Sequence, residues 1–305
     1  MCLLAVTAIG VEMSLTKKVL ITDLDNTLFD WVELWVRCFS AMLEELVVIS
    51  GVPKSQLIPE ISIVHQKHGT SEYSFLIEEL PSLQKFLAGR NALEVFAPAV
   101  NAFREKREEY LLLYPGVADT LQELKKRGTL IVGYTESMAF YSNYRVRKLG
   151  LDGVFDYIFC PEDHIVPDDV EETRRYPAEH YVLKSTIQHH TPKGSKKPDV
   201  DVLQWIVSDL SLKTSECVYI GDSLMKDIAM ANDCGIDSVW AKYGVAHKRD
   251  EYKLLQEVTH WTPAEVEREQ KIREREHVSP SFVLDEGFAE LLSIFDFKSF
   301  VGARG

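Results

Sequence analysis

Two rhythms of apolar and polar positions divide the chain. After a short apolar run at residues 18–23, apolar side chains recur every three or four residues at Trp31, Trp35, Phe39, Met42, Leu46 and Ile49. This spacing predicts one amphipathic helix, which Gly51 and Pro53 would end. Helical patterning continues to about residue 112 without a strong strand signal. We therefore expect residues 31–112 to form a smaller helical module inserted after the first strand.

From about residue 113 onward, strand-like and helix-like segments alternate. Strands are expected at residues 129–134, 157–160, 217–220 and 238–240, and helices begin near residues 116, 138, 198 and 224. Such alternation is typical of a parallel sheet with helices on both faces. The sequence therefore predicts an α/β fold, in which residues 17–30 and 113–305 form a doubly wound, Rossmann-like core and the helical module is a second domain.

Several segments depart from this rhythm. Residues 161–195 are long and polar for a simple connection, so we expect a surface excursion with room for a short helix around Lys184 and with His189 and His190 in solvent. Residues 261–278 begin with a capping-box pattern and continue as a helix that is polar almost all round, which indicates an exposed arm. Residues 1–16 are expected to be a poorly ordered extension, and residues 281–295 a last strand and helix.

Composition narrows the class of partner. The 305 residues carry 34 Lys and Arg against 47 Asp and Glu, a net charge of -13, which repels polyanions, so nucleic acid is not an expected partner. Five scattered cysteines without CxxC spacing predict neither a disulfide framework nor a zinc site and favour a reducing compartment. The sequence has no apolar run long enough to predict a membrane span. We expect a cytoplasmic protein, either a monomer or a homodimer.

Charged and hydroxyl side chains follow the expected strands at the points where the strands end. They are Asp23 and Asp25 after the first strand, Thr135 after the second, Lys196 and Lys197 before the helix near residue 198, and Asp222 and Asp227 after the strand at 217–220. Ligands bind outside the carboxyl ends of parallel strands, so these groups should gather at one edge of the sheet. Two like charges about 4 Å apart repel by about 4 kcal/mol at an effective dielectric constant near 20, so a positive group must lie among the carboxylates. An all-oxygen set of ligands suits Mg2+.

Four short segments carry a family resemblance. "DLDNTL", "GYTES", "KKPD" and "GDSLMKD", in this order and after these strands, resemble the four motifs of the haloacid dehalogenase superfamily of phosphohydrolases. The helical module at residues 31–112 is similar to the C1 cap of that superfamily, and the resemblance covers about residues 17–245. It implies a Mg2+-dependent phosphatase that hydrolyses a small phosphorylated metabolite through an aspartyl-phosphate intermediate.

The resemblance also implies roles for individual residues. Asp23 would be the nucleophile, and Asp25 would exchange protons with the leaving alcohol and then with water. Around the phosphoryl group would lie Asp23, Thr135, Glu136 and Lys197. The Mg2+ ion would be held by the side chains of Asp23 and Asp222 and the backbone carbonyl of Asp25, with Asp227 close by.

Two positions depart from the family pattern. The second motif usually continues with asparagine where this chain has Glu136. A carboxylate there would repel phosphate, so we expect the side chain to face the helix or a residue of the cap. The third motif has adjacent lysines, and Lys197 is favoured over Lys196 because a lysine directly before Pro198 is the commoner pattern.

Other functions stay open at this point. The same aspartyl phosphate would serve a phosphotransferase or a phosphomutase. The fold would also suit a binding or regulatory protein without turnover, and Glu136 is the feature that favours this reading. A dehalogenase is disfavoured because a departing halide needs no proton from Asp25.

The sequence says less about the substrate pocket. Candidates to line it beneath the cap are Trp31, Trp35 and Tyr73, although core packing is the expected role of at least one tryptophan. Arg104 and Arg107 are expected to face water, as charged residues on helices usually do. His65 and His68 are expected to be surface or cap residues rather than metal ligands, because no third ligand accompanies them.

Overall fold

The computed structural model describes residues 15–165, 178–245, 252–258 and 278–301. Within these residues, seven parallel strands form one sheet in the order β5-β4-β3-β2-β6-β7-β8. The strands are β2 (Val19–Thr22), β3 (Leu130–Tyr134), β4 (Tyr157–Cys160), β5 (Ile187–His190), β6 (Cys217–Gly221), β7 (Asp237–Ala241) and β8 (Phe282–Leu284). The first strand of the sequence motifs, β2, is therefore central, with β3 on one side and β6 on the other.

The sheet is buried on both faces. Successive residues of a strand point to opposite faces, and here Leu20 and Val218 enter one apolar cluster while Val19 and Tyr219 enter another. Helices α7 (Val117–Lys126) and α8 (Ala139–Lys148) contribute to the first cluster, and α9 (Val200–Asp209) and α10 (Ala229–Asp233) to the second. The prediction of a doubly wound α/β core is confirmed.

Between β2 and α7 the chain forms six helices. They are α1 (Trp31–Ser50), α2 (Lys54–His68), α3 (Leu76–Glu79), α4 (Pro81–Leu87), α5 (Ala92–Val95) and α6 (Ala97–Tyr110). Asp30 caps the start of α1 by accepting a hydrogen bond from the Glu33 N–H at 2.9 Å, and α1 ends at Gly51, whose φ of 69° favours glycine.

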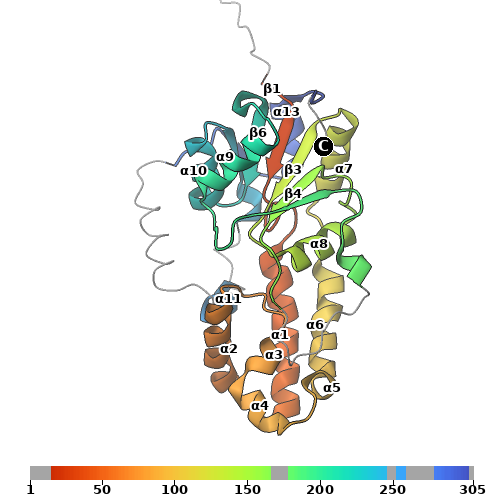
Figure 1. The fold of residues 1–305 in the computed structure, drawn as a ribbon, viewed down its shortest axis with the longest axis vertical. Helices are drawn as coiled ribbons and strands as arrows, with labels where there is room; N and C mark the ends of the chain where they lie inside the picture. Colours follow the sequence, from red (N-terminus) through yellow and green to blue (C-terminus); the bar gives the residue numbers. More distant parts are fainter. Residues whose placement is uncertain (1–14, 166–177, 246–251, 259–277, 302–305) are drawn as a thin grey trace, which may run out of the picture.

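These six helices, which we call the cap, share an apolar cluster of their own. Figure 1 shows them as a lobe at one end of the molecule, with α8 between the lobe and the sheet. Helix α11 (Tyr252–Glu257) lies against α2, and Leu255 and Val258 join the cap's cluster. The cap is therefore closed in part by a segment from far along the chain.

The polar stretch at residues 161–195 differs from its prediction. A 3-10 helix at Ala178–Tyr181 takes the place of a helix around Lys184, and residues 187–190 form the edge strand β5. His189 and His190 belong to that strand, and the His189 ring stacks on Phe159 with centroids 4.9 Å apart. Strand β5 is half exposed and lacks apolar alternation, so periodicity could not reveal it.

The ends of the chain agree in part with expectation. The expected last strand and helix are β8 and α13 (Leu291–Ile294), and β1 (Thr16–Lys17) pairs with β9 (Asp296–Phe297) in a small second sheet that the pattern did not predict. The predicted arm at 261–278 and the extension at 1–16 fall almost wholly outside the described residues. Among the helices described, none is both long enough and apolar enough to cross a bilayer.

Candidate active site

The end of β2 places two aspartates at the carboxyl edge of the sheet. The Asp23 N–H donates to the Ile220 carbonyl at 2.9 Å, which extends the pairing of β2 with β6 by one residue. Leu24 then enters the core with 2 % of its surface exposed. Asp25 follows at a turn in which Asn26 has a φ of 57°. The Thr27 hydroxyl donates to Asp23 Oδ2 at 3.1 Å and fixes the first carboxylate.

Lys197 reaches the same edge from the loop before α9. Its Nζ lies 2.5 Å from Asp23 Oδ1 and 3.0 Å from Asp227 Oδ1. Burial by itself would lower the pKa of this ammonium, but the carboxylates of Asp227 and Asp23 outweigh burial and raise the pKa well above its ordinary value. Lys197 therefore stays charged, and it is Lys197 rather than Lys196 that the structure brings to Asp23.

The end of β6 supplies the remaining carboxylates. A Cβ at Gly221 would lie 2.3 Å from the Asp227 Cγ, so only glycine lets Asp227 fold back against the strand. Asp227 Oδ1 accepts a hydrogen bond from the Tyr219 hydroxyl at 2.9 Å, and Oδ2 accepts one from the Ser223 N–H at 3.1 Å. The backbone carbonyl of Asp222 accepts a hydrogen bond from Trp240 Nε1 at 2.9 Å, but its carboxylate accepts none from the described residues.

Three of the carboxylates are close enough to hold one metal ion. One oxygen each from Asp23, Asp222 and Asp227 lies within 4.8 Å of the others. Burial, followed by the neighbouring carboxylates, raises the pKa of Asp23 to about 7 and that of Asp222 well above its ordinary value. One lysine cannot balance this negative charge, and a divalent cation would. The donors are all oxygen and the Asp222 carboxylate accepts no competing hydrogen bond from the described residues, so these residues fit Mg2+.

The end of β3 brings Thr135 and Glu136 to the edge. Thr135 Oγ1 donates to Asp25 Oδ2 at 3.3 Å. Glu136 accepts a hydrogen bond from the Lys197 backbone N–H at 3.1 Å and pairs with Lys226 Nζ at 2.8 Å. Burial would raise the pKa of Glu136, but Lys226 outweighs it and the pKa falls. The charge of this carboxylate is therefore balanced by Lys226, which lies in the short helix Leu224–Ile228 after β6 and not in the cap.

Sequence reasoning missed three residues around Asp25. Arg145 Nη1 lies 3.2 Å from Asp25 Oδ1 and donates to Ser137 Oγ at 2.9 Å. The Ser137 hydroxyl in turn donates to Asp25 Oδ2 at 2.7 Å. Arg145 Nη2 also forms an ion pair with Glu72 of the cap. Arg145 is only 5 % exposed. The sequence pattern did not single it out, because its helix, α8, carries several other charged residues.

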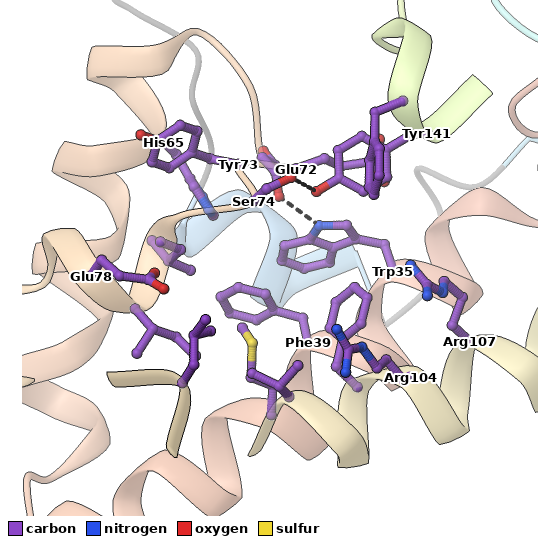
Figure 2. A pocket seen from close by; sticks show the side chains of 18 of the residues that line it. Trp35, Phe39, His65, Glu72, Tyr73, Ser74, Glu78, Arg104, Arg107 and Tyr141 are labelled. Atoms are coloured by element: carbon purple, nitrogen blue, oxygen red, sulfur yellow. Dashed lines mark hydrogen bonds between the residues drawn. The ribbon is translucent and has the colours of Figure 1, made fainter. Parts of the chain in front are cut away.

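Glu72 also lines a pocket between the helices of the cap and α8 (Figure 2). Trp35 and Tyr73 line it, as considered possible from the sequence, whereas Trp31 packs between the apolar clusters. Arg104 and Arg107 also line the pocket, so the expectation that they face water is wrong. Helix α6 turns these two residues inward because Ala97–Tyr110 packs along α1.

The two histidines of the cap, His65 and His68, are held by contacts with neighbouring residues. His65 is 1 % exposed and lines the pocket, so it is not a surface residue. His68 Nε2 lies 2.9 Å from Glu79 Oε1, and its ring stacks on Tyr73 with centroids 3.6 Å apart. Neither histidine is among the described residues that could together hold a metal ion, which are Asp23, Asp222 and Asp227.

Comparison with known proteins agrees with this geometry. The family model for haloacid dehalogenase-like hydrolases matches residues 17–235. The glyceraldehyde 3-phosphate phosphatase of Pyrococcus furiosus is 25% identical over 277 residues, which cover 88% of this chain and 98% of that protein. A phosphoglycolate phosphatase of Pseudomonas fluorescens is 29% identical over 160 residues, or 52% of this chain and 46% of that protein.

Solved structures show the same fold. The 2-haloacid dehalogenase of Pseudomonas syringae pv. Tomato superposes with a TM-score of 0.52 at 21% identity, covering 91% of this chain and 97% of the other. The family match spans well over half of the chain, and it includes all the carboxylates at the edge of the sheet. The chain therefore belongs to the haloacid dehalogenase-like hydrolases.

Proposed function

We propose that this protein is a Mg2+-dependent phosphatase that hydrolyses small phosphate esters through a phosphorylated Asp23. The observation that carries the proposal is the grouping of the Asp23, Asp222 and Asp227 carboxylates at one edge of the sheet, where Lys197 Nζ contacts Asp23 and Asp227. Two relatives are named for the phosphatase reaction on glyceraldehyde 3-phosphate and on phosphoglycolate. Both names denote small phosphate esters, which supports the same substrate class here.

In the first step, a carboxylate oxygen of Asp23 attacks phosphorus and the bond from phosphorus to the ester oxygen breaks. Asp25 gives a proton to the departing alcohol. In the second step, water attacks the acyl phosphate, Asp25 takes the proton of that water, and inorganic phosphate leaves Asp23 free again. Each step uses a group that the structure places at the edge of the sheet.

Positive charge makes this chemistry possible, because both the nucleophile and the phosphoryl group are anionic. Lys197, held at 2.5 Å from Asp23 Oδ1, supplies one fixed charge beside the attacking oxygen. Mg2+, held by Asp23 and Asp222, would supply the rest by neutralising phosphoryl oxygens. Asp227 would orient Lys197, because its own oxygens already accept hydrogen bonds from Tyr219 and Ser223.

Glu136 has a supporting role in this proposal. Its carboxylate is committed to the Lys226 ammonium and to the Lys197 backbone N–H. It would therefore hold the loop that carries Lys197 instead of meeting the phosphoryl group. This removes the repulsion that favoured a protein without turnover.

Release of inorganic phosphate from p-nitrophenyl phosphate and from small aliphatic phosphate esters tests the proposal. We expect hydrolysis with Mg2+ present, and its loss with EDTA and in the Asp23→Asn variant. Asp201→Asn, which replaces an exposed aspartate in the first turn of α9, is the matched control and should retain activity. Phosphate release without an added acceptor alcohol would also exclude an obligatory phosphotransferase. Absence of release from every ester would refute the proposal.

A further inference from the structure

The pocket between the cap and α8 is built mainly from large apolar side chains. Trp35 and Phe39 stack with ring centroids 4.5 Å apart, and Met42 and Phe103 add to the same wall. The space between the lining residues is about 870 Å³, part of it continuous with solvent. Such walls favour an aromatic or branched aliphatic group over a small, strongly hydrated one, because apolar surface gains free energy when it leaves water.

The pocket begins close to the proposed acid, Asp25. Glu72, Ser74 and Tyr141 form one side of the pocket, and the Ser74 and Tyr141 hydroxyls lie 3.0 Å apart. Glu72 contacts both Ser137 and Arg145, which hold the Asp25 carboxylate. A departing alcohol that takes its proton from Asp25 would lie on the Asp25 side of the phosphoryl group, and Glu72 connects that side to the pocket.

Arg107 gives the pocket a chemical preference. Its guanidinium lies over the Tyr144 ring at 4.1 Å from the centroid, which leaves the edge of the fork for an acceptor. The Nε atom is buried without a hydrogen-bond partner, and Arg107 forms no ion pair with the described carboxylates. A buried donor without an acceptor costs about 1–3 kcal/mol, so a bound carboxylate would relieve a cost that the protein carries by itself.

The opposite side of the pocket disfavours an anion. His65 Nδ1 lies 2.7 Å from the Val258 carbonyl and therefore donates to it, which leaves Nε2 as an acceptor that is buried without a partner. Burial lowers the pKa of His65 to about 4, so the ring is neutral. Glu78 lies on the same side as His65, and Arg104 and Arg107 lie across from them (Figure 2). A carboxylate is therefore directed to the Arg107 side.

We propose that this pocket binds the organic part of the substrate, and that the substrate is a phosphate ester of a largely apolar alcohol, aromatic or branched, bearing a carboxylate that pairs with Arg107. The proposal rests on the proposed phosphatase function and narrows it to one substrate class. It assigns specificity to contacts that the edge of the sheet does not supply.

Three phosphate esters separate the two features of this ligand. They are 4-(carboxymethyl)phenyl phosphate, its carboxamide analogue, and phosphoglycolate, which has a carboxylate without an apolar body. We expect kcat/KM to be at least about 10-fold higher for the aryl carboxylate than for the carboxamide, since one well-placed charged hydrogen bond is worth about that factor. We expect at least the same factor over phosphoglycolate, because phosphoglycolate has no apolar body to bury in the pocket. In Arg107→Gln the ratio of carboxylate to carboxamide should fall to near unity.

Lys106→Gln is the matched control, because it removes one positive charge from the same helix at a side chain that pairs with Glu109 outside the pocket. It should leave the ratio as in the unmodified protein. An unchanged ratio in Arg107→Gln, or a higher kcat/KM for phosphoglycolate than for the aryl carboxylate, would overturn the proposal while phosphate release left the phosphatase function intact.

A binding measurement keeps the pocket testable even if no ester is hydrolysed. Isothermal titration with 3-phenylpropionate, which has no phosphate, should detect binding that Arg107→Gln weakens at least about 10-fold and Lys106→Gln does not. Where hydrolysis is measurable, the same compound should inhibit competitively. Absence of binding, or inhibition that leaves the KM for the ester unchanged, would show that this pocket does not hold the leaving group.

Discussion

The edge of the sheet and the pocket next to the cap differ in the kinds of side chain that form them and in how these side chains are positioned. At the edge, charged side chains from β2, β6 and the loop before α9 lie within hydrogen-bond reach of one another, and each is placed by the end of a strand or the start of a helix. In the pocket, aromatic and aliphatic side chains from α1, α3 and α6 meet through helix packing, and the polar side chains, such as His65 and Arg107, lie on opposite sides. The difference teaches that strand topology positions the residues proposed for the reaction, whereas helix packing positions those proposed for selectivity.

One ion pair joins the two regions. Glu72 belongs to the wall of the pocket, and Arg145 belongs to the helix that follows β3. Because Arg145 also contacts Asp25, the position of the cap and the orientation of the proposed acid depend on the same guanidinium. The comparison between the regions can therefore be tested at the edge, in the pocket and at the link between them.

The largest expected effect is at the edge. Lys197→Met should lower kcat at least about 100-fold, because a fixed positive charge beside the phosphoryl group is lost. Steady-state kinetics at saturating Mg2+ measures this, with circular dichroism to confirm folding. Lys196→Met is the control and should retain most activity. Similar losses in both variants would contradict the assignment of Lys197.

The next effect concerns the stability of the pocket region and its dependence on pH. The folded pKa of His65, about 4, lies below its ordinary value of 6.5 because burial penalises the charged ring. As the pH falls, the unfolded chain therefore binds the proton first. The contribution of His65 to the free energy of unfolding is fully present above about pH 6.5, and up to about 3 kcal/mol of it is lost as the pH drops toward 4. Urea unfolding at a series of pH values, compared between the unmodified protein and His65→Gln, isolates this contribution. An equal slope in both proteins would contradict it.

A smaller effect is expected at the link. Arg145→Gln should reduce kcat about 10-fold through misorientation of Asp25, and Arg145→Lys should recover part of the loss because it keeps the charge. Glu72→Gln should act through Arg145, so the double variant should be no slower than Arg145→Gln alone. Multiplicative losses in the double variant would show that the two residues act independently.

Metal binding should also change the thermal stability of the protein. Mg2+ at a hundredfold excess over its dissociation constant should stabilise the folded protein by about 2.7 kcal/mol and raise Tm by a few degrees. Asp222→Asn should abolish this gain, and Asp201→Asn should preserve it. A gain that survives in Asp222→Asn would place the metal elsewhere.

Sequence reasoning was strongest at the edge for a physical reason. Parallel strands read as buried apolar runs, and the residues after them must meet at one edge. The pattern alone therefore predicts one edge of the sheet for Asp23, Asp25, Thr135, Asp222 and Asp227. The roles of these residues stay proposals, as do the domain boundaries and the C1 type of the cap.

The same reasoning failed where contacts join distant segments. Arg145 is buried because Glu72 of the cap and Asp25 both face it, and no periodicity encodes that meeting. Arg107 faces inward because of how α6 packs on α1, although its charge alone predicted a solvent-facing position. Strand β5 was not predicted, because its half-exposed edge residues, such as His189 and His190, show no alternation of apolar and polar positions.

The central claim is that Asp23 becomes phosphorylated, and an acid quench with an ester labelled in its phosphoryl group tests it most directly. With p-nitrophenyl phosphate, whose leaving group needs no proton, Asp25→Asn should form the acyl phosphate but hydrolyse it slowly. It should therefore accumulate protein-bound label that hydroxylamine removes and that maps to Asp23. Asp23→Asn should retain none. Label in Asp23→Asn, or steady hydrolysis with no label on any protein, would contradict the account.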